Sequence, residues 1–590
     1  MRRRPTIAGF EYPASSAGFL LSFLILLASP ILSFQAEPAA IDYPIVFTQV
    51  ELAGDDAEPR SHLALRNPDG TVETLTTDFY AARDPDVSFD GERILFSAKA
   101  ERGGHWQVYE MNADGSEARR ITRESFDCRQ PLYQSYFYVI TSDDPWHQIS
   151  FIGSAGGLPS NLYSTRLDGS EPRRLTFNPY GDTDPFLMPD GRILLSSRQS
   201  NRLEPGEADR QALFGVNLDG ADYAVFSADE GARWKRMPAV TTDGLAVFVE
   251  NDERQPDGSG WLAAVTLRRN LHSHRRLSER AEGLYHSPSP LPGGEILVSR
   301  RPAGGGSHGL YRFSPGTGGA VLIHDDPGYH DIQGRMLAPR PEPDGRSSVV
   351  SDEDPTGILY CLNAYQSDFP NRNWMPPGSA SRLRVVEGLP RPGQGEGPDP
   401  APARRVVGEI AIERDGSFNI RVPANIPLQL QLLDENGLAL RTCSWIWVKN
   451  GEPRGCIGCH EDNELTPENR MVDAMRKASI SLTLPPERRR RVTYEESVLP
   501  IVERKCANGA CHGGTVPPRL REASDARVHA AKTARTSPLA WRLFGRNMSR
   551  PWDETVVTGL TMEAMPPEGA EPLTEDERRT ILEWIDLGAE

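Results

Sequence analysis

The stretch Phe89-Asp90-Gly91-Glu92-Arg93-Ile94-Leu95-Phe96-Ser97 places a tight turn directly before an apolar strand, and related stretches return along the chain. Similar units occur at residues 189–196, 242–244 and 292–298. Asp-Gly and Gly-Gly between apolar runs are hairpin signals, because these residues tolerate positive φ. The recurrence indicates a repeat of about fifty residues between positions 42 and 365.

A second turn alternates with the first inside each repeat. It is present in Tyr109-Glu110-Met111-Asn112-Ala113-Asp114-Gly115, Leu167-Asp168-Gly169-Ser170 and Asn217-Leu218-Asp219-Gly220. Two hairpin turns imply four strands per repeat, and a four-stranded repeat of this length is a propeller blade. We predict an all-β propeller of six blades, with seven as the alternative, closed by residues 45–49 and 346–365. An open array of β-sandwiches is the competing architecture.

A second β region follows a linker rich in Pro and Gly at residues 388–404. Apolar and polar residues alternate at 407–412, 418–422 and 428–433, and residues 444–448 add a last apolar run. With Asp-Gly and Asn-Gly turns between them, these runs indicate antiparallel strands. We therefore predict a small immunoglobulin-like β-sandwich within a middle domain of residues 380–480.

Two haem-attachment motifs lie in the last quarter of the chain. The first is Cys456-Ile457-Gly458-Cys459-His460, and the second, Cys506-Ala507-Asn508-Gly509-Ala510-Cys511-His512, has four residues between its cysteines. In a c-type site two thiols bind the porphyrin and the adjacent His becomes an axial iron ligand. We predict two covalently bound c-type haems, attached by Cys456, Cys459, Cys506 and Cys511, with His460 and His512 as iron ligands. A zinc site or a redox disulfide is the alternative use of such cysteine pairs.

Residues 490–590 are typical of a small, mainly α, class I-like cytochrome c domain. A helix is expected at residues 494–505, and Thr574 and Glu577 form a capping box before a second helix. Met565 stands in a Pro-rich loop between them and is the predicted axial ligand of the second iron, with Met562 or a buried core role as alternatives. For the first iron the candidate distal ligand is His330, or the position is open.

Composition and the N-terminus place the protein outside the inner membrane. The net charge of −17 argues against nucleic acid and anionic membrane surfaces as partners. Three arginines and an apolar run at residues 17–28 indicate a signal peptide of residues 1–36, so we expect an exported, periplasmic chain without a membrane span once mature. An uncleaved anchor is the alternative. The remaining cysteines, Cys128, Cys361 and Cys443, are buried thiols or include a Cys361–Cys443 disulfide.

Several stretches resemble hydrazine synthase alpha-subunit-related proteins. Asp415-Gly416-Ser417-Phe418 and Gly451-Glu452-Pro453-Arg454-Gly455, which leads into the first motif, are similar to that family's middle domain. Gly328-Tyr329-His330-Asp331-Ile332 is similar to the end of its TolB-like propeller. The resemblance implies a propeller, a haem-bearing middle domain and a C-terminal cytochrome c. In that family a Tyr just after the first motif binds the catalytic iron, whereas Glu461-Asp462-Asn463-Glu464 stands here, so hydrazine formation is not implied.

These observations support three functions. The first is an exported dihaem cytochrome that carries out electron transfer with a redox partner protein. The alternative is a multihaem redox enzyme, an oxidoreductase subunit related to hydrazine synthase, acting on a small nitrogen or oxygen species at an open first haem. The third is a binding protein whose propeller recognises a partner, with a small-molecule ligand as a further expectation.

Overall fold

The structure of the chain is a computed structural model, which describes most of the residues. The described ranges are 41–52, 58–139, 145–201, 203, 209–227, 230–351, 353–367, 375–392, 401–458, 470–507, 512–513, 518–530, 533–551, 553 and 563–590. The expected signal peptide therefore lies outside them, as do Cys459, His460, Cys511 and Met562. Within these ranges no helix combines the length and the apolar character that a membrane crossing needs.

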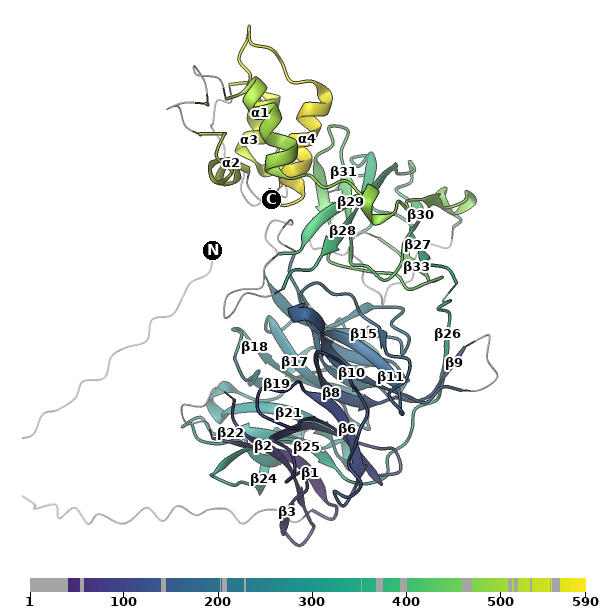
Figure 1. The fold of residues 1–590 in the computed structure, drawn as a ribbon, viewed down its shortest axis with the longest axis vertical. Coiled ribbons are helices and arrows are strands. Elements are labelled where there is room, and N and C mark those ends of the chain that lie inside the picture. The colour runs from purple at the N-terminus through teal and green to yellow at the C-terminus, as the bar shows by residue number, and fades with distance from the viewer. Residues whose placement is uncertain are drawn as a thin grey trace, which may run out of the picture. The chain divides into compact units, whose positions relative to one another are not determined.

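The N-terminal part of the chain consists of antiparallel sheets arranged as in a propeller (Figure 1). The strands are β1 (Ile45–Glu51), β2 (Ser61–Arg66), β3 (Val72–Thr74), β4 (Ala81–Val87), β5 (Arg93–Lys99), β6 (Gln107–Asn112), β7 (Arg119–Arg120), β8 (Asp127–Tyr133), β9 (Phe137–Val139), β10 (Gln148–Ser154), β11 (Asn161–Arg166), β12 (Arg173–Arg174), β13 (Asp182–Leu187), β14 (Ile193–Gln199), β15 (Arg210–Val216), β16 (Ala224–Ser227), β17 (Trp234–Val240), β18 (Leu245–Asn251), β19 (Trp261–Thr266), β20 (Arg275–Arg276), β21 (Leu284–Pro290), β22 (Ile296–Arg301), β23 (Gly309–Phe313), β24 (Ala320–His324), β25 (Tyr329–Met336) and β26 (Arg346–Ser348). Two sheets of four strands alternate along the chain with two of eight, and in each larger sheet one parallel pair joins two four-stranded units.

Strand β25 closes the ring of sheets, which corrects the expected closing segment. It pairs with β1 along its length, and Gln49 Nε2 donates to Asp331 Oδ1 (2.9 Å) across the seam. The segment at 346–365 does not take part: β26 pairs with β9, and β27 (Thr356–Cys361) joins a sheet of the next domain. The eight residues of β25 already supply the fourth strand that the first unit needs.

The first strand of each four-stranded unit carries a bulge, in which two residues face one residue of the neighbouring strand. In β4 the two are Asp84 and Pro85, which lie between the paired residues Arg83 and Asp86. Each bulge begins with a non-glycine residue at positive φ: Asp84 (59°), Gln130 (51°), Asp184 (54°), Met237 (53°), Ser287 (48°) and Gln333 (59°). A left-handed backbone costs such a residue about 1–2 kcal/mol. The surrounding structure must therefore stabilise it.

The middle domain is a sandwich of two four-stranded sheets, as predicted. One sheet has the order β33-β27-β30-β34 and the other β29-β28-β31-β32. The strands are β28 (Arg382–Leu389), β29 (Ala403–Ala411), β30 (Phe418–Pro423), β31 (Leu428–Leu433), β32 (Ala439–Thr442), β33 (Pro453–Cys456) and β34 (Ile480–Ser481). The expected strand at 444–448 is wrong, since only Ile446 makes a single bridge, to Leu428.

The C-terminal part is helical. A π-helical turn (Tyr494–Val498) continues into α1 (Leu499–Lys505), followed by α2 (Ala523–Ala530), α3 (Pro538–Phe544) and α4 (Glu575–Asp586). Short 3-10 turns are at Ala155–Gly157, Arg280–Glu282, Pro292–Gly294, Ala474–Arg476, Pro486–Arg488 and Ala534–Thr536. The capping box of Thr574 and Glu577 is confirmed. The apolar face of α4 is buried, and Trp584 lies 5.2 Å from the Tyr494 ring between centroids. The described chain is thus mainly β with few helices.

Candidate functional site

The second haem motif begins where α1 ends, and its histidine is oriented by the backbone. The His512 N–H donates to Cys506 O (3.1 Å), and His512 Nδ1 lies 3.1 Å from Pro518 O. A carbonyl can only accept, so the Nδ1–H of His512 donates to it and Nε2 is left with its lone pair. Histidines that bind metals usually donate their other ring N–H in this way. His512 therefore fits the role of an iron ligand.

The predicted sulfur ligand, Met565, is half-buried near the end of α3. Its backbone N–H donates to Arg542 O (2.8 Å), which holds the loop against that helix. Ala564 lies against Gly545, the residue in the left-handed conformation that ends α3. The role of Met565 as an axial ligand stays a prediction, and its alternative, Met562, lies outside the described residues.

The first haem motif begins at the end of β33, on the edge of the sandwich. Cys456 pairs in register with the buried Cys361 of β27 and is partly buried against the sandwich core. Gly458 has no room for a side chain, because a Cβ there would lie 2.3 Å from Gln366 O. The motif thus leaves the sheet through a turn that this glycine permits. Cys459 and His460 lie outside the described residues.

Buried polar contacts fix the sandwich to the helical part. The Arg384 guanidinium, whose side chain is 1% exposed, lies 2.8 Å from Glu409 and 3.5 Å from Glu583 of α4. Asp586 accepts hydrogen bonds from Ala439 N (2.9 Å) in β32 and Ala534 N (2.7 Å). Burial raises the pKa of Asp586, so the backbone N–H groups offset only part of the cost of its charge.

The sandwich also contacts the propeller through residues 447–454. Trp447 is buried in a core cluster of the propeller, 4.0 Å from the Tyr223 ring, and its Nε1 donates to Gly220 O (3.2 Å). Glu452 accepts a hydrogen bond from Asp222 N (2.9 Å). This explains why residues 444–448 do not form a strand: the segment turns its Trp447 side chain into the propeller instead of pairing with the sheet.

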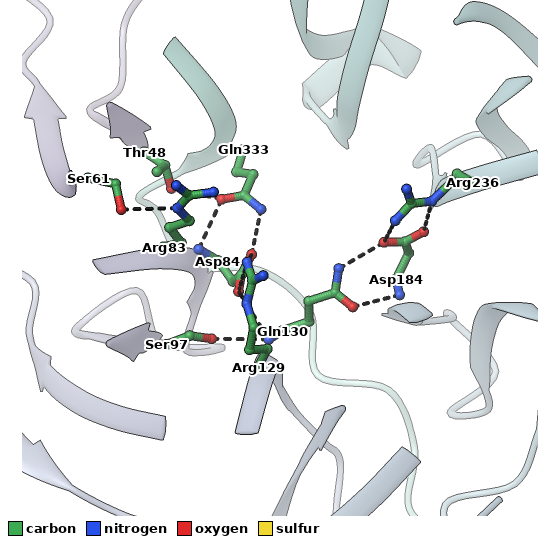
Figure 2. A network of polar contacts seen from close by, with 10 residues as sticks. All are labelled: Thr48, Ser61, Arg83, Asp84, Ser97, Arg129, Gln130, Asp184, Arg236 and Gln333. Atoms are coloured by element: carbon green, nitrogen blue, oxygen red, sulfur yellow. Dashed lines mark hydrogen bonds and ion pairs between the residues drawn. The ribbon is translucent and has the colours of Figure 1, made fainter. Parts of the chain in front are cut away.

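A cavity of about 360 Å³ occupies the propeller channel and is lined mainly by the bulged strands β4, β8, β13, β17, β21 and β25. A chain of hydrogen bonds links the bulges around it (Figure 2). Asp84 N donates to Gln333 Oε1 (3.0 Å), Gln130 N to Asp84 Oδ2 (3.2 Å), Asp184 N to Gln130 Oε1 (2.8 Å), Met237 N to Asp184 Oδ2 (3.2 Å) and Ser287 N to Met237 Sδ (3.3 Å). Five of the six left-handed residues, all except Gln333, are thus held by a hydrogen bond to the bulge side chain of the neighbouring unit.

Two carboxylates of these bulges are neutralised by arginines. Arg129 lies 3.2 Å from Asp84, and Arg236 lies 3.1 Å from Asp184. Burial disfavours the charge of each carboxylate, but the neighbouring guanidinium and the hydrogen bonds prevail, so the pKa of both carboxyls is lowered. Both aspartates are therefore charged and already paired.

Three histidines line another part of the cavity. His330, the candidate distal ligand, lies here: its Nδ1 is 3.2 Å from both the backbone N and Nδ1 of His308. Its described contacts come from the propeller, and its role as a distal ligand of the first iron stays a prediction. Desolvation lowers the pKa of His286 to about 4 and that of His308 to about 3, although the nearby Asp257 carboxylate opposes both shifts, and desolvation also lowers the pKa of His330. All three rings are therefore neutral at pH 7.

The residues that line the channel were not identified from the sequence, although a signal is present. A proline follows the left-handed residue in five bulges, as Asp84-Pro85, Gln130-Pro131, Asp184-Pro185, Met237-Pro238 and Ser287-Pro288. These dipeptides recur about every fifty residues, in phase with the Asp-Gly turns. A proline inside a strand pattern marks an edge or a bulge, and its recurrence would have located the first strand of each unit.

Comparisons with known proteins agree on one relationship. Residues 378–461 match the model of the hydrazine synthase alpha subunit middle domain. Hydrazine synthase subunit alpha of Kuenenia stuttgartiensis is 24% identical in an alignment 712 residues long. This alignment covers 88% of this chain and 86% of the relative. The solved structure of Kuenenia stuttgartiensis hydrazine synthase shares the fold, with a TM-score of 0.78 and 22% identity over 93% of this chain and 94% of that chain.

TolB from Acinetobacter baumannii matches more weakly, with a TM-score of 0.38 and 14% identity over 50% of this chain and 67% of that chain. The propeller-like architecture therefore rests on the strand pairing and on the first structure, not on TolB. The chain is thus related to the hydrazine synthase alpha subunit along most of its length, and residues 378–461 match the model of that subunit's middle domain.

Proposed function

We propose that the chain is the alpha-type subunit of an exported dihaem redox enzyme related to hydrazine synthase. The supporting observation is its similarity to hydrazine synthase subunit alpha over 88% of its length, with a C-x-x-C-H motif inside the matched middle domain. A cytochrome that only transfers electrons accounts for the motifs but not for this similarity. It becomes the alternative hypothesis.

The proposal assigns a role to each part of the chain. Residues 1–36 are a signal peptide that directs export to the periplasm, and the propeller has six blades, one for each bulged strand. The middle domain within residues 380–480 holds the first haem, and a class I-like cytochrome c domain at residues 490–590 holds the second. A redox partner protein exchanges electrons with the second haem.

The site residues follow from the motifs. A c-type haem supplies an iron that transfers single electrons and, with an open axial position, binds a small molecule. Cys456 and Cys459 attach the first haem. Cys506 and Cys511 attach the second, and His512 binds its iron through Nε2. The hydrogen bond to the Pro518 carbonyl supports this role, because it fixes the orientation of the His512 ring (3.1 Å).

The substrate class is a small nitrogen compound bound at the first haem. The name of the relative, hydrazine synthase, suggests this substrate class, and the residues after the first motif limit which reaction is proposed. Glu461-Asp462-Asn463-Glu464 follows the first motif where the family has a tyrosine ligand, which leaves His460 as the adjacent ligand. We therefore propose a related redox reaction and not hydrazine formation itself.

Absorption spectra of the mature protein test the proposal. The chain is produced in a host that attaches c-type haem, reduced, and measured with and without CO. We expect two haems per chain and a CO-induced change in about half of the Soret absorbance, since only the first iron is open. Addition of hydroxylamine should perturb the same fraction. If CO changes nothing, both irons are six-coordinate and the electron-transfer alternative is the better account.

Paired variants locate the open iron. Cys456→Ser with Cys459→Ser removes the first attachment site, and Cys506→Ser with Cys511→Ser removes the second. The first pair should abolish the CO response and retain one haem. The second pair should retain the CO response. The opposite assignment would place the reactive iron in the cytochrome domain and contradict the proposal.

A further inference from the structure

The propeller channel contains charge that the proposed haem chemistry does not use. Arg83, Arg129, Arg236 and Arg335 all line its cavity of about 360 Å³. Arg129 and Arg236 are neutralised by Asp84 and Asp184. A third carboxylate of the lining, Asp257, is paired with Arg301 (3.4 Å). Among the described residues, no carboxylate forms an ion pair with Arg83 or Arg335, so the cavity walls still carry an excess of positive charge.

Arg83 presents unused donors to this cavity. Its Nε donates to Ser61 Oγ (3.0 Å), and its guanidinium carbon lies 5.8 Å from the Trp106 ring centre. Its two terminal nitrogens have no hydrogen-bond partner in the described part of the chain. Figure 2 shows this guanidinium beside Gln333, at one end of the chain of hydrogen bonds between the bulges. A planar guanidinium with free terminal N–H groups has the geometry that binds two oxygens of one anion.

His330 adds a donor of defined tautomer. Its Nδ1 faces the backbone N–H of His308 at 3.2 Å and therefore acts as an acceptor. A neutral imidazole with an accepting Nδ1 carries its proton on Nε2. That Nε2–H has no described partner, and His330 lines the same cavity as Arg83.

The electrostatics of the cavity favour an anion over a cation. Desolvation and the neighbouring Arg129 charge lower the pKa of Arg83 to about 10. Desolvation is also the main cause that lowers the pKa of His308 and His330, with the Arg301 charge adding to it and the Asp257 carboxylate opposing it. Among the described residues, no three His, Cys, Asp or Glu side chains are grouped so as to hold a metal ion. An anion would relieve the repulsion between the Arg83 and Arg129 guanidinium groups, and a cation would increase it.

We propose that the propeller channel is a binding site for a small oxyanion, held by Arg83 and Arg335 with the Nε2–H of His330 as a further donor. The cavity is roughly ten times the volume of one water molecule, so it admits a hydrated inorganic oxyanion or a small carboxylate. This site lies in the propeller and makes no use of the haem motifs, so it goes beyond the proposed function.

Isothermal titration calorimetry of the full-length holoprotein tests the proposal. Inorganic phosphate, nitrite and acetate are titrated separately, in a buffer without other oxyanions. We expect saturable binding of one anion per chain for at least one probe, and the preferred probe distinguishes a tetrahedral inorganic anion from a planar one or a carboxylate. Haem spectra recorded alongside should stay unchanged for the channel ligand, which separates this outcome from binding at an iron.

The matched variants are Arg83→Gln and Arg192→Gln. Loss of one charge-assisted guanidinium contact should weaken binding roughly tenfold to a hundredfold in the first variant. Arg192 is a half-buried propeller residue that is paired with Asp190 and does not line the cavity, so its variant should bind as the wild type does. Arg83→Lys keeps the charge and should bind the anion with an affinity between those of the wild type and the glutamine variant. Binding by this variant shows that a loss in Arg83→Gln does not reflect misfolding. Absence of saturable binding by any probe, or equal affinities in all variants, would overturn the proposal.

Discussion

The left-handed bulges predict an unusual order of stability for substitutions at Gln130. Its side chain donates to Asp184 Oδ1 (2.8 Å) and accepts from Asp184 N (2.8 Å), and its backbone has φ 51°. Gln130→Ala removes both hydrogen bonds, one of them to a charged carboxylate. Because both groups border the cavity and water replaces part of the loss, we expect a decrease of about 2–4 kcal/mol in the free energy of unfolding.

Gln130→Gly should be less destabilising than Gln130→Ala. Glycine removes the same hydrogen bonds, but it avoids the strain of about 1–2 kcal/mol that a left-handed backbone imposes on alanine. Its greater freedom in the unfolded chain costs about 0.5–1 kcal/mol. The difference leaves the glycine variant more stable than the alanine variant by about 0.5–1 kcal/mol, whereas at an ordinary strand position the order is reversed.

Urea unfolding of the holoprotein, followed by tryptophan fluorescence, measures this difference between two variants of one site. Val72 of β3 provides the control, because it is exposed and is not among the residues at positive φ. There, alanine should be more stable than glycine. If the glycine variant is less stable than the alanine variant at Gln130 too, and by the same margin as at Val72, the backbone strain assigned to the bulges is refuted.

Three further predictions concern a buried acid, the second haem and the domain interface. Burial raises the pKa of Asp331 from 3.8 to about 7, so between these two pH values the folded state binds a proton that the unfolded state has lost. The free energy of unfolding should therefore fall as the pH rises from about 4 to 7, by up to about 1.4 kcal/mol per pH unit. In Asp331→Asn this slope should be lost between pH 4 and 7, and an unchanged slope in urea unfolding would exclude Asp331 as its source. Met565→Ala should lower the reduction potential of the second haem and open its iron to CO, and an unchanged potential in a redox titration would contradict the assignment. Arg384→Met leaves the 1%-exposed Glu583 without one of its cations and should cost about 3–5 kcal/mol in urea unfolding. The exposed Arg382→Met control should cost less than about 1 kcal/mol, and equal losses would argue against a buried interface.

Local signals in the sequence predicted the parts of the fold that local chemistry determines. The Asp-Gly turns are present, with Gly91 at φ 79° and Gly115 at φ 86°, because these positions require a residue without a Cβ. The capping box at Thr574 and the helix before Cys506 also follow from neighbouring residues alone. The cysteine motifs are contiguous, so the haem prediction needed no tertiary information.

Contacts between distant segments were not predictable in the same way. His330 was assigned to the first iron from its place in the chain, but pairing of β25 with β1 brings it to His308 in the channel. Residues 444–448 form an apolar run typical of a buried strand, yet burial of Trp447 in the propeller outweighs pairing within the sandwich. In both cases the deciding interaction joins residues that are far apart in sequence, and periodicity carries no information about such contacts.

The sandwich connects both haem motifs to the rest of the molecule. Arg454, two residues before Cys456, donates to Trp447 O (2.9 Å) and to the Tyr223 carbonyl of the propeller, so the strand that leads into the first motif is held from two sides. The second motif is positioned from the other sheet, where Arg384 and the backbone of Ala439 bind acidic residues of α4. Through these bonds the sandwich contacts both segments, whereas the propeller contacts the first and the helical part the second. A fixed geometry between the two motifs therefore depends on the sandwich. The sandwich residues that make these contacts, Arg454, Arg384 and Ala439, all lie within residues 378–461, the range that matches the model of the hydrazine synthase alpha subunit middle domain.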